Sequence, residues 1–136
     1  MKKVLSLVCL SALLATFLFA FVSCGVPNED PMKAKEALEE NGFVVKMSEE
    51  DGIIYLDAKS ETDAISIQYF ATEMAAQDGY ERAKAVLNKY YSSDEAYKLA
   101  MDKKIGVEGL TYDDFECGIL GMMVWMGTSA AISAAK

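Results

Sequence analysis

Residues 43–57, Phe-Val-Val-Lys-Met-Ser-Glu-Glu-Asp-Gly-Ile-Ile-Tyr-Leu-Asp, give the clearest indication of how this chain folds. β-Branched and aromatic residues predict strands over 43–47 and 52–57, and the polar stretch 48–52 predicts the loop between them. The pair Asp51-Gly52 is typical of a tight turn between antiparallel strands. This stretch therefore predicts a β-hairpin, the best-supported long-range contact in the sequence.

The segments next to this hairpin carry a helix and a further strand. Asp30 and Pro31 are typical of a helix start, and Gly42 is typical of a helix end, so we expect a helix from Pro31 to about Asn41. Apolar and polar residues alternate over 64–70, which predicts a half-buried strand.

The longest predicted helix follows that strand, with Thr72 as its cap. Its apolar stripe consists of Ala76, Tyr80, Ala83, Leu87 and Tyr90. Gly79 lies inside this helix, where glycine lowers helix stability by about 1 kcal/mol relative to alanine. Its presence therefore indicates a kink or a close approach to another backbone. Ser92 and Glu95 have the spacing of a capping box and predict a shorter helix that ends near Lys103.

The C-terminal part of the sequence is unusually apolar. Residues 105–112 predict a weak strand, and residues 117–126, Cys-Gly-Ile-Leu-Gly-Met-Met-Val-Trp-Met, predict one buried strand. Both faces of this strand are apolar, so we expect it to be central and covered on both sides. If helices cover only one face, the other has to meet a ligand or a second copy. A break over 127–129 and a short helix over 130–135 complete the chain.

This order of elements predicts a single α+β domain over residues 31–136. We expect two layers, with helices packed on a mostly antiparallel sheet of four to five strands. A ferredoxin-like arrangement is one candidate. The uncharged stretch 117–135 has 19 residues, so a membrane span is the alternative for that segment.

The first 24 residues have a pattern of their own. Lys2 and Lys3 precede an uncharged apolar run, and Ser23-Cys24 follows it. This pattern resembles the signal peptide and lipobox of bacterial lipoproteins. The resemblance implies cleavage of residues 1–23 between Ser23 and Cys24, lipidation of Cys24, and a tether over residues 24–30. Phe21 stands where these signals more often have leucine.

The lipoprotein resemblance also implies a location, which is the extracytoplasmic face of the cell membrane, because two acyl chains anchor a protein stably. Two alternatives remain open for this segment. Residues 4–22 could stay uncleaved and span the membrane. An ordinary signal peptidase could also leave Cys24 unlipidated, which would permit a Cys24–Cys117 disulfide. The ending over 127–132 is similar to that of small lipoproteins of low-GC Gram-positive bacteria, and this similarity implies no activity.

Composition excludes several classes of function. The chain has 13 basic and 21 acidic residues, and two of the lysines lie in the leader, so residues 24–136 carry a formal charge of −10. That charge argues against nucleic-acid binding and against adhesion to anionic headgroups. The sequence contains no histidine, which excludes Ser-His-Asp and Cys-His catalysis and His-ligated metal sites.

Other candidate sites have simpler interpretations. Asp113, Asp114 and Glu116 could bind calcium, but we interpret them as a solvated acidic turn. We interpret Cys117 as a small core residue because no histidine is present to activate it. A groove of aromatic residues and a soft-metal site at Met122, Met123 and Met126 are also conceivable, but core packing is the simpler interpretation for both sets.

The sequence therefore predicts a lipid-anchored, non-enzymatic module that binds a protein or a small ligand. We expect membrane contact through the lipid alone, no nucleic-acid partner, no metal and no cofactor. A homodimer is one arrangement that would cover a spare apolar face. The alternative function is a small carboxylate- or metal-dependent hydrolase at the cell surface.

Overall fold

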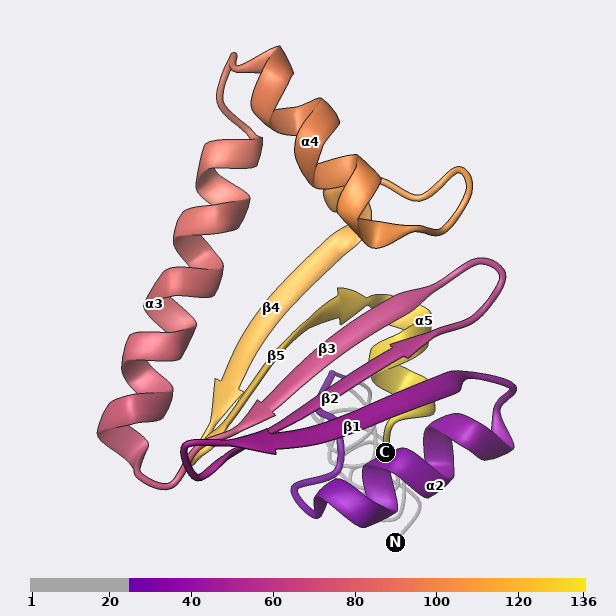
Figure 1. Cartoon of the computed structure of the whole chain (residues 1–136), viewed down its shortest axis with the longest axis vertical. Helices are drawn as coiled ribbons and strands as arrows, with labels where there is room; N and C mark the ends of the chain where they lie inside the picture. The colour runs from indigo at the N-terminus through magenta and orange to yellow at the C-terminus, as the bar shows by residue number, and fades with distance from the viewer. Residues whose placement is uncertain (1–24) are drawn as a thin grey trace, which may run out of the picture.

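A computed structural model of the chain describes residues 25–136, which form a five-stranded antiparallel sheet with helices packed on it (Figure 1). The elements follow one another as α2 (Pro31–Glu40), β1 (Val44–Glu50), β2 (Ile53–Lys59), β3 (Ala64–Tyr69), α3 (Glu73–Tyr90), α4 (Glu95–Ile105), the 3-10 turn η1 (Tyr112–Asp114), β4 (Phe115–Leu120), β5 (Met123–Thr128) and α5 (Ser129–Ala134). The order across the sheet is β1-β2-β3-β5-β4. The predicted α+β class is confirmed.

The hairpin of β1 and β2 is built as the sequence predicts, and its strands are longer than expected. Asp51 and Gly52 have positive φ angles of 53° and 77° and form a two-residue turn. Such a turn matches the twist of the strands. Pairing therefore continues up to Glu50 and Ile53, although the end of β1 is polar and exposed.

Local hydrogen bonds start the helices. Oδ1 of Asp30 accepts from the backbone N–H groups of Met32 and Lys33, and Oγ1 of Thr72 accepts from that of Ala75, as expected from cap residues. The capping box expected at Ser92 is absent. The hydroxyl of Ser92 turns back to the carbonyl of Lys89, and Asp94 caps α4 instead, because its carboxylate reaches the N–H of Tyr97.

The expected weak strand over 105–112 is also absent. Gly106 has a φ of 67° and ends α4 in a left-handed conformation, after which the chain turns. The 3-10 turn η1 follows, and Thr111 and Asp114 form a reciprocal cap around it.

The apolar stretch 117–126 is a hairpin rather than one strand. β4 runs to Leu120, the chain turns at Gly121 (φ 58°) and Met122, and β5 pairs back onto β4. β5 also pairs with β3, so β5 is the central, two-sided apolar strand and β4 is the sheet edge.

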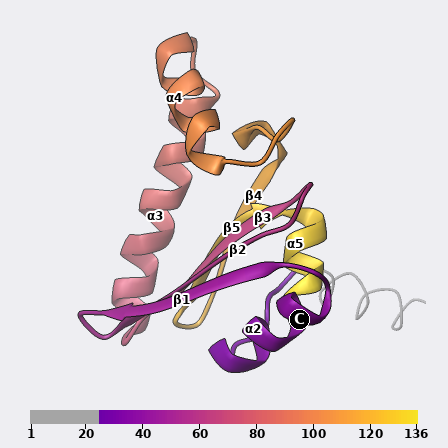
Figure 2. The same cartoon turned by 45° about the vertical axis from the view of Figure 1, so that its right-hand side comes forward.

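The helices lie on both faces of the sheet, which adds one layer to the expected two (Figure 2). α2 and α5 contact β1, β2, β3 and β5 from one side, here called the α2 face. α3 contacts β4 and β5 from the other side, here called the α3 face. β3 and β4 are both antiparallel to β5, which lies between them, so they run parallel to each other and are joined through α3 and α4 in a split βαβ unit. The element order nevertheless differs from the β-α-β-β-α-β order of a ferredoxin-like fold, because β1, β2 and β3 follow one another without a helix between them.

Side chains alternate between these faces and build separate cores. The core of the α2 face contains Leu38, Leu56, Ile67, Trp125 and Ile132. The core of the α3 face contains Leu87, Tyr90, Met101, Ile105 and Phe115, with a smaller cluster around Phe70 and Val124. The sheet and all three clusters are built within residues 25–136, so a polypeptide of these residues carries every contact of the fold described here.

The C-terminal segment 117–135 consists of most of the β4–β5 hairpin and the short helix α5, so it does not form the single long helix that a membrane span would need. None of the helices within residues 25–136 has the length and apolar character needed to cross a bilayer. The expected span over 4–22, the cleavage site at Ser23 and the lipidation site at Cys24 lie outside the described residues.

Residues 26–28 lie against the folded body. Val26 packs on the core of the α2 face and Pro27 is buried. The N–H of Asn28 donates to the carbonyl of Ala135 over 2.7 Å, and the hydroxyl of Tyr69 donates to the carbonyl of Asn28 over 2.9 Å. The start of the described chain is therefore joined to its end.

Candidate functional site: a groove on the open half of the sheet

The helices leave half of one sheet face uncovered. α3 lies beside β4, away from β1, and contacts β4 and β5 (Figure 1). On the α3 face, Ile53 of β2 and Ala64 of β3 pack against α3 or α4, whereas the side chains in the middle of β1, β2 and β3 are exposed or half-buried. We call this surface the open half, and it carries Val44, Lys46, Tyr55, Asp57, Ser66 and Gln68.

Two adjoining cavities follow the open half where it meets the helices. The larger, of about 510 Å³, lies between β1, β2 and β3 and the end of α4. The smaller, of about 200 Å³, lies between β3, β5 and α3. Ser66 and Met126 line both cavities, so the two cavities adjoin there, and together they are called the groove below.

The floor of the larger cavity is apolar. Ile105, Phe115 and Met126 contribute carbon or sulfur surface from three separate elements, and Val44 adds a side chain that is 80% exposed. An apolar floor with a few polar groups is the usual lining of a small-molecule site, and such sites measure about 300 to 1,000 Å³.

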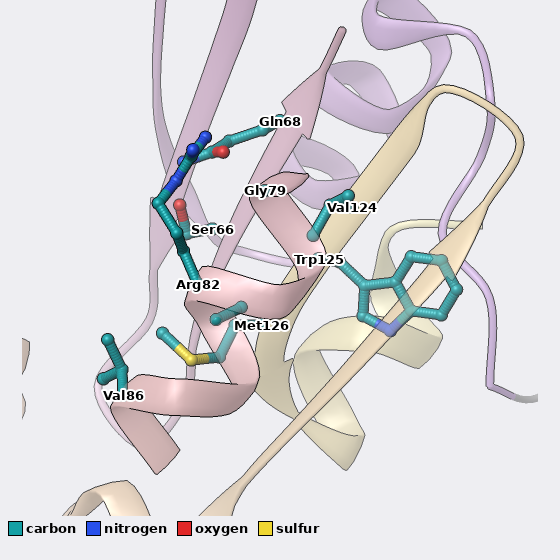
Figure 3. A pocket seen from close by; sticks show the side chains of 9 residues that line it. Ser66, Gln68, Gly79, Arg82, Val86, Val124, Trp125 and Met126 are labelled. Atoms are coloured by element: carbon teal, nitrogen blue, oxygen red, sulfur yellow. The ribbon is translucent and has the colours of Figure 1, made fainter. Parts of the chain in front are cut away.

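The smaller cavity is lined by polar as well as apolar side chains. Figure 3 shows Arg82 reaching from α3 toward the side chains of Ser66 and Gln68 on β3, with Val86 and Met126 below it. Arg82 is the only arginine of the chain. Ser66 and Gln68 are half-buried and face the cavity with hydroxyl and amide groups.

Basic residues are concentrated along this groove. Lys46, Lys59 and Lys104 line the larger cavity and Arg82 lines the smaller, whereas Asp57 is the only acidic lining residue of either. The two ion pairs among residues 25–136 join Lys35 to Glu39 and Lys84 to Glu81, so neither uses a groove cation.

One of these lysines has a second contact. A Cβ atom added at Gly106 would lie 3.0 Å from Nζ of Lys59, so this ammonium group sits against the C-terminal end of α4. The C-terminal end of a helix is its negative end. Lys59 therefore connects β2 with α4 as well as lining the groove.

The carboxylates suggested as a calcium site do not converge. Asp114 accepts from the N–H of Thr111, and Glu116 accepts from the hydroxyl of Ser129 over 3.0 Å. Asp113 is exposed. No group of three or more acidic or cysteine side chains within residues 25–136 is placed to hold a metal ion.

Cys117 lies on β4, half-buried against the core of the α3 face. Burial raises the pKa of its thiol, and the nearby Lys84 ammonium opposes that shift. A thiol with a raised pKa is a poor nucleophile at neutral pH. This environment is that of a packing residue, in agreement with the interpretation from the sequence.

The methionines and aromatic residues separate into core and surface. Met123 and Trp125 are buried in the core of the α2 face, Met126 lines the groove, and Met122 is 49% exposed in the β4–β5 turn. The three methionines therefore do not form one soft-metal site. Tyr112 lines the larger cavity.

Comparisons with known proteins add no constraint. No protein-family model, curated protein or solved structure matches this chain. The function of the groove is therefore inferred from the residues that line it.

Sequence reasoning did not identify the groove residues as a site. Lys46 and Asp57 were recognisable as polar residues on predicted strands, and Arg82 as the only arginine. Their proximity depends on the order of the strands and on which face each helix covers, and neither property is encoded in a local pattern.

Proposed function

We propose that this protein is a lipid-anchored, extracytoplasmic binding module whose ligand occupies the groove, and that it binds this ligand without catalysing a reaction. The location rests on the leader residues, in which two lysines, an apolar run and Ser23-Cys24 follow one another. The lipid at Cys24 connects the module to the membrane.

The observation that carries the binding role is the uncovered half of the sheet. Every other large sheet surface near the centre packs against a helix, whereas β1, β2 and β3 present one face to cavities of about 510 and 200 Å³. Apolar side chains such as Val44 remain exposed there. A ligand would cover this surface and remove it from water.

A binding role fits the chemistry of the groove better than hydrolysis does. Asp57 is the only carboxylate that lines the groove, so a pair of carboxylates for acid and base catalysis is not available there. The sequence also lacks histidine, the usual proton carrier at neutral pH.

The anchor is tested in a bacterial host that processes lipoproteins, with Cys24→Ser as the variant. The native chain should lose its leader and remain in the membrane fraction. The variant should keep the leader or leave that fraction, as seen in apparent mass and in cell fractionation. A variant of unchanged mass and location would contradict the lipid anchor.

The groove is tested with residues 25–136 and a neutral apolar dye, Nile red. The variant Ser66→Trp places an indole where the two cavities meet, so we expect it to weaken dye binding about tenfold or more. The matched control, Ser133→Trp, adds the same indole to the exposed surface of α5 and should leave dye binding unchanged. Equal binding by both variants would contradict a ligand site in the groove.

A further inference from the structure

We propose that the groove is selective for small amphiphilic anions, with an apolar body on the floor of the larger cavity and a carboxylate or phosphate group directed to Lys46, Lys104 and Arg82. This inference rests on the proposed binding function and specifies the class of ligand.

The distribution of charge carries the argument. Residues 25–136 contain 21 acidic and 11 basic residues, since Lys2 and Lys3 lie in the leader. The groove lining nevertheless holds four of the basic residues and one acidic residue, Asp57. A positively charged cleft within a negatively charged surface attracts anionic ligands and repels cationic ones.

These cations are available to a ligand. Lys46 lies directly across from Asp57 in the strand register, yet among residues 25–136 the two form no ion pair, and neither Lys104 nor Arg82 has an ion-pair partner there. Lys59 is partly used by the end of α4. Arg82 can present two N–H groups to one carboxylate or phosphate, with the Ser66 hydroxyl and the Gln68 amide as further donors.

The apolar floor defines the rest of the ligand. Ile105, Phe115 and Met126 offer no hydrogen bonds, so a fully polar anion such as inorganic phosphate would leave this apolar surface exposed to water. Each methylene group that covers the floor strengthens binding by about fourfold, as in small-molecule transfer from water. A chain or ring of several carbons attached to the anionic group meets both requirements.

The dimensions favour a small molecule over a macromolecule. The larger cavity, of about 510 Å³, has the volume of a small-molecule site. A second copy docked by the same face would bring like charges together, because both partners in a two-fold interface present the same patch. A nucleic acid or anionic bilayer would meet the acidic surface outside the groove.

The experiment compares three ligands with the same carbon chain, namely decanoate, decanol and decylamine, by calorimetric titration of residues 25–136. Wild-type protein should bind decanoate most tightly and decylamine least. In the triple variant Lys46→Gln, Arg82→Gln, Lys104→Gln, decanoate binding should weaken about tenfold, since each exposed charge contributes about two- to fivefold. Decanol binding should stay the same.

A matched triple variant, Lys33→Gln, Lys98→Gln, Lys103→Gln, removes the same number of charges outside the groove and should keep the preference for decanoate. Circular dichroism confirms the fold of both variants. If decanol and decanoate bind equally, the inference of anion selectivity fails while the proposed binding function stands. If none of the three ligands binds, the proposed groove function fails as well.

Discussion

Three glycines make room for larger neighbours. A Cβ atom at Gly118 would lie 2.3 Å from the indole of Trp125, one at Gly79 would lie 2.4 Å from the ring of Phe70, and one at Gly127 would lie 2.7 Å from Ile65. None of these glycines has a positive φ, so each is required by space rather than by backbone conformation. Of the two explanations suggested for Gly79, the structure supports the close approach, and the neighbour is the Phe70 side chain.

Gly118→Ala should destabilise the protein, because the added methyl group overlaps the buried Trp125 ring. Overpacking of this kind costs about 1 to 3 kcal/mol. Urea unfolding followed by Trp125 fluorescence measures the change in the free energy of unfolding. The control, Gly25→Ala, adds the same methyl group in open space and should change the free energy of unfolding little. Equal stability of the two variants would contradict the packing of Trp125 over Gly118.

Cys117 should react slowly with thiol reagents, because burial raises its pKa and hides its sulfur. The labelling rate of residues 25–136 should rise with pH around a midpoint above that of an unfolded peptide. Lys84→Gln removes the cation that opposes the rise in the Cys117 pKa, so the labelling midpoint of this variant should move to a still higher pH. A midpoint at or below the value in denaturant would contradict this environment.

Among the elements, α3, α4 and η1 are joined by one carboxylate. Oδ1 of Asp102 accepts from the hydroxyl of Tyr90 over 2.8 Å and from the N–H of Tyr112 over 3.1 Å. Beside it, the ring of Tyr112 stacks on that of Phe115 with centroids 5.0 Å apart and lies tilted against that of Tyr90 with centroids 5.7 Å apart. This connection holds α4 at one end of the groove.

Asp102→Ala should destabilise the fold by about 2 to 3 kcal/mol, because it leaves a buried hydroxyl and an N–H without their charged acceptor. Asp102→Asn keeps an acceptor oxygen and should cost less. Asp113→Ala, an exposed acid in η1, is the control and should be near neutral. Thermal unfolding measures all three, and equal losses for Asp102 and Asp113 would contradict the role of Asp102.

Across the whole molecule, the contacts of residues 26–28 determine where the start of the described chain lies. The contacts of Asn28 with Ala135 and Tyr69 place the start of the described chain beside α5, and α4 lies at the opposite end (Figure 1). Gly25 alone separates Cys24 from the packed residues. A lipid at Cys24 would therefore hold the α5 end near the bilayer and the α4 end away from it.

Dyes on introduced cysteines test this orientation in lipidated protein that carries Cys117→Ser. Energy transfer to an acceptor in the membrane should be stronger from Ser133→Cys on α5 than from Ser93→Cys before α4. Equal transfer from both positions would show that residues 25–28 act as a free tether, and loss of transfer from both would point to an absent anchor.

The oligomeric state is a second property of the whole molecule. A homodimer through the groove would bring Lys46, Lys104 and Arg82 of one copy against those of the other, and such like-charge contacts are unfavourable. Residues 25–136 should therefore be monomeric in size-exclusion chromatography with light scattering at micromolar concentration. A dimer that dissociates in the variant Val44→Glu would instead identify the open half as a self-interface.

Local chemistry made several elements predictable. Asp30 and Thr72 cap their helices with hydrogen bonds to residues two or three positions away, and Asp51-Gly52 supplies two left-handed residues for a turn. Cap bonds and turn conformations depend on neighbours along the chain, so the composition of a short segment is sufficient to predict them.

The tertiary structure determined how residues 117–126 divide and which sheet surface stays open. An apolar run fits one long strand as well as two short ones, and pairing of β5 with both β3 and β4 favours the turn at Gly121. The groove requires Lys46, Arg82 and Lys104, which come from β1, α3 and α4. Such proximity follows from packing between distant segments, because helix placement is set by which apolar faces can be buried together.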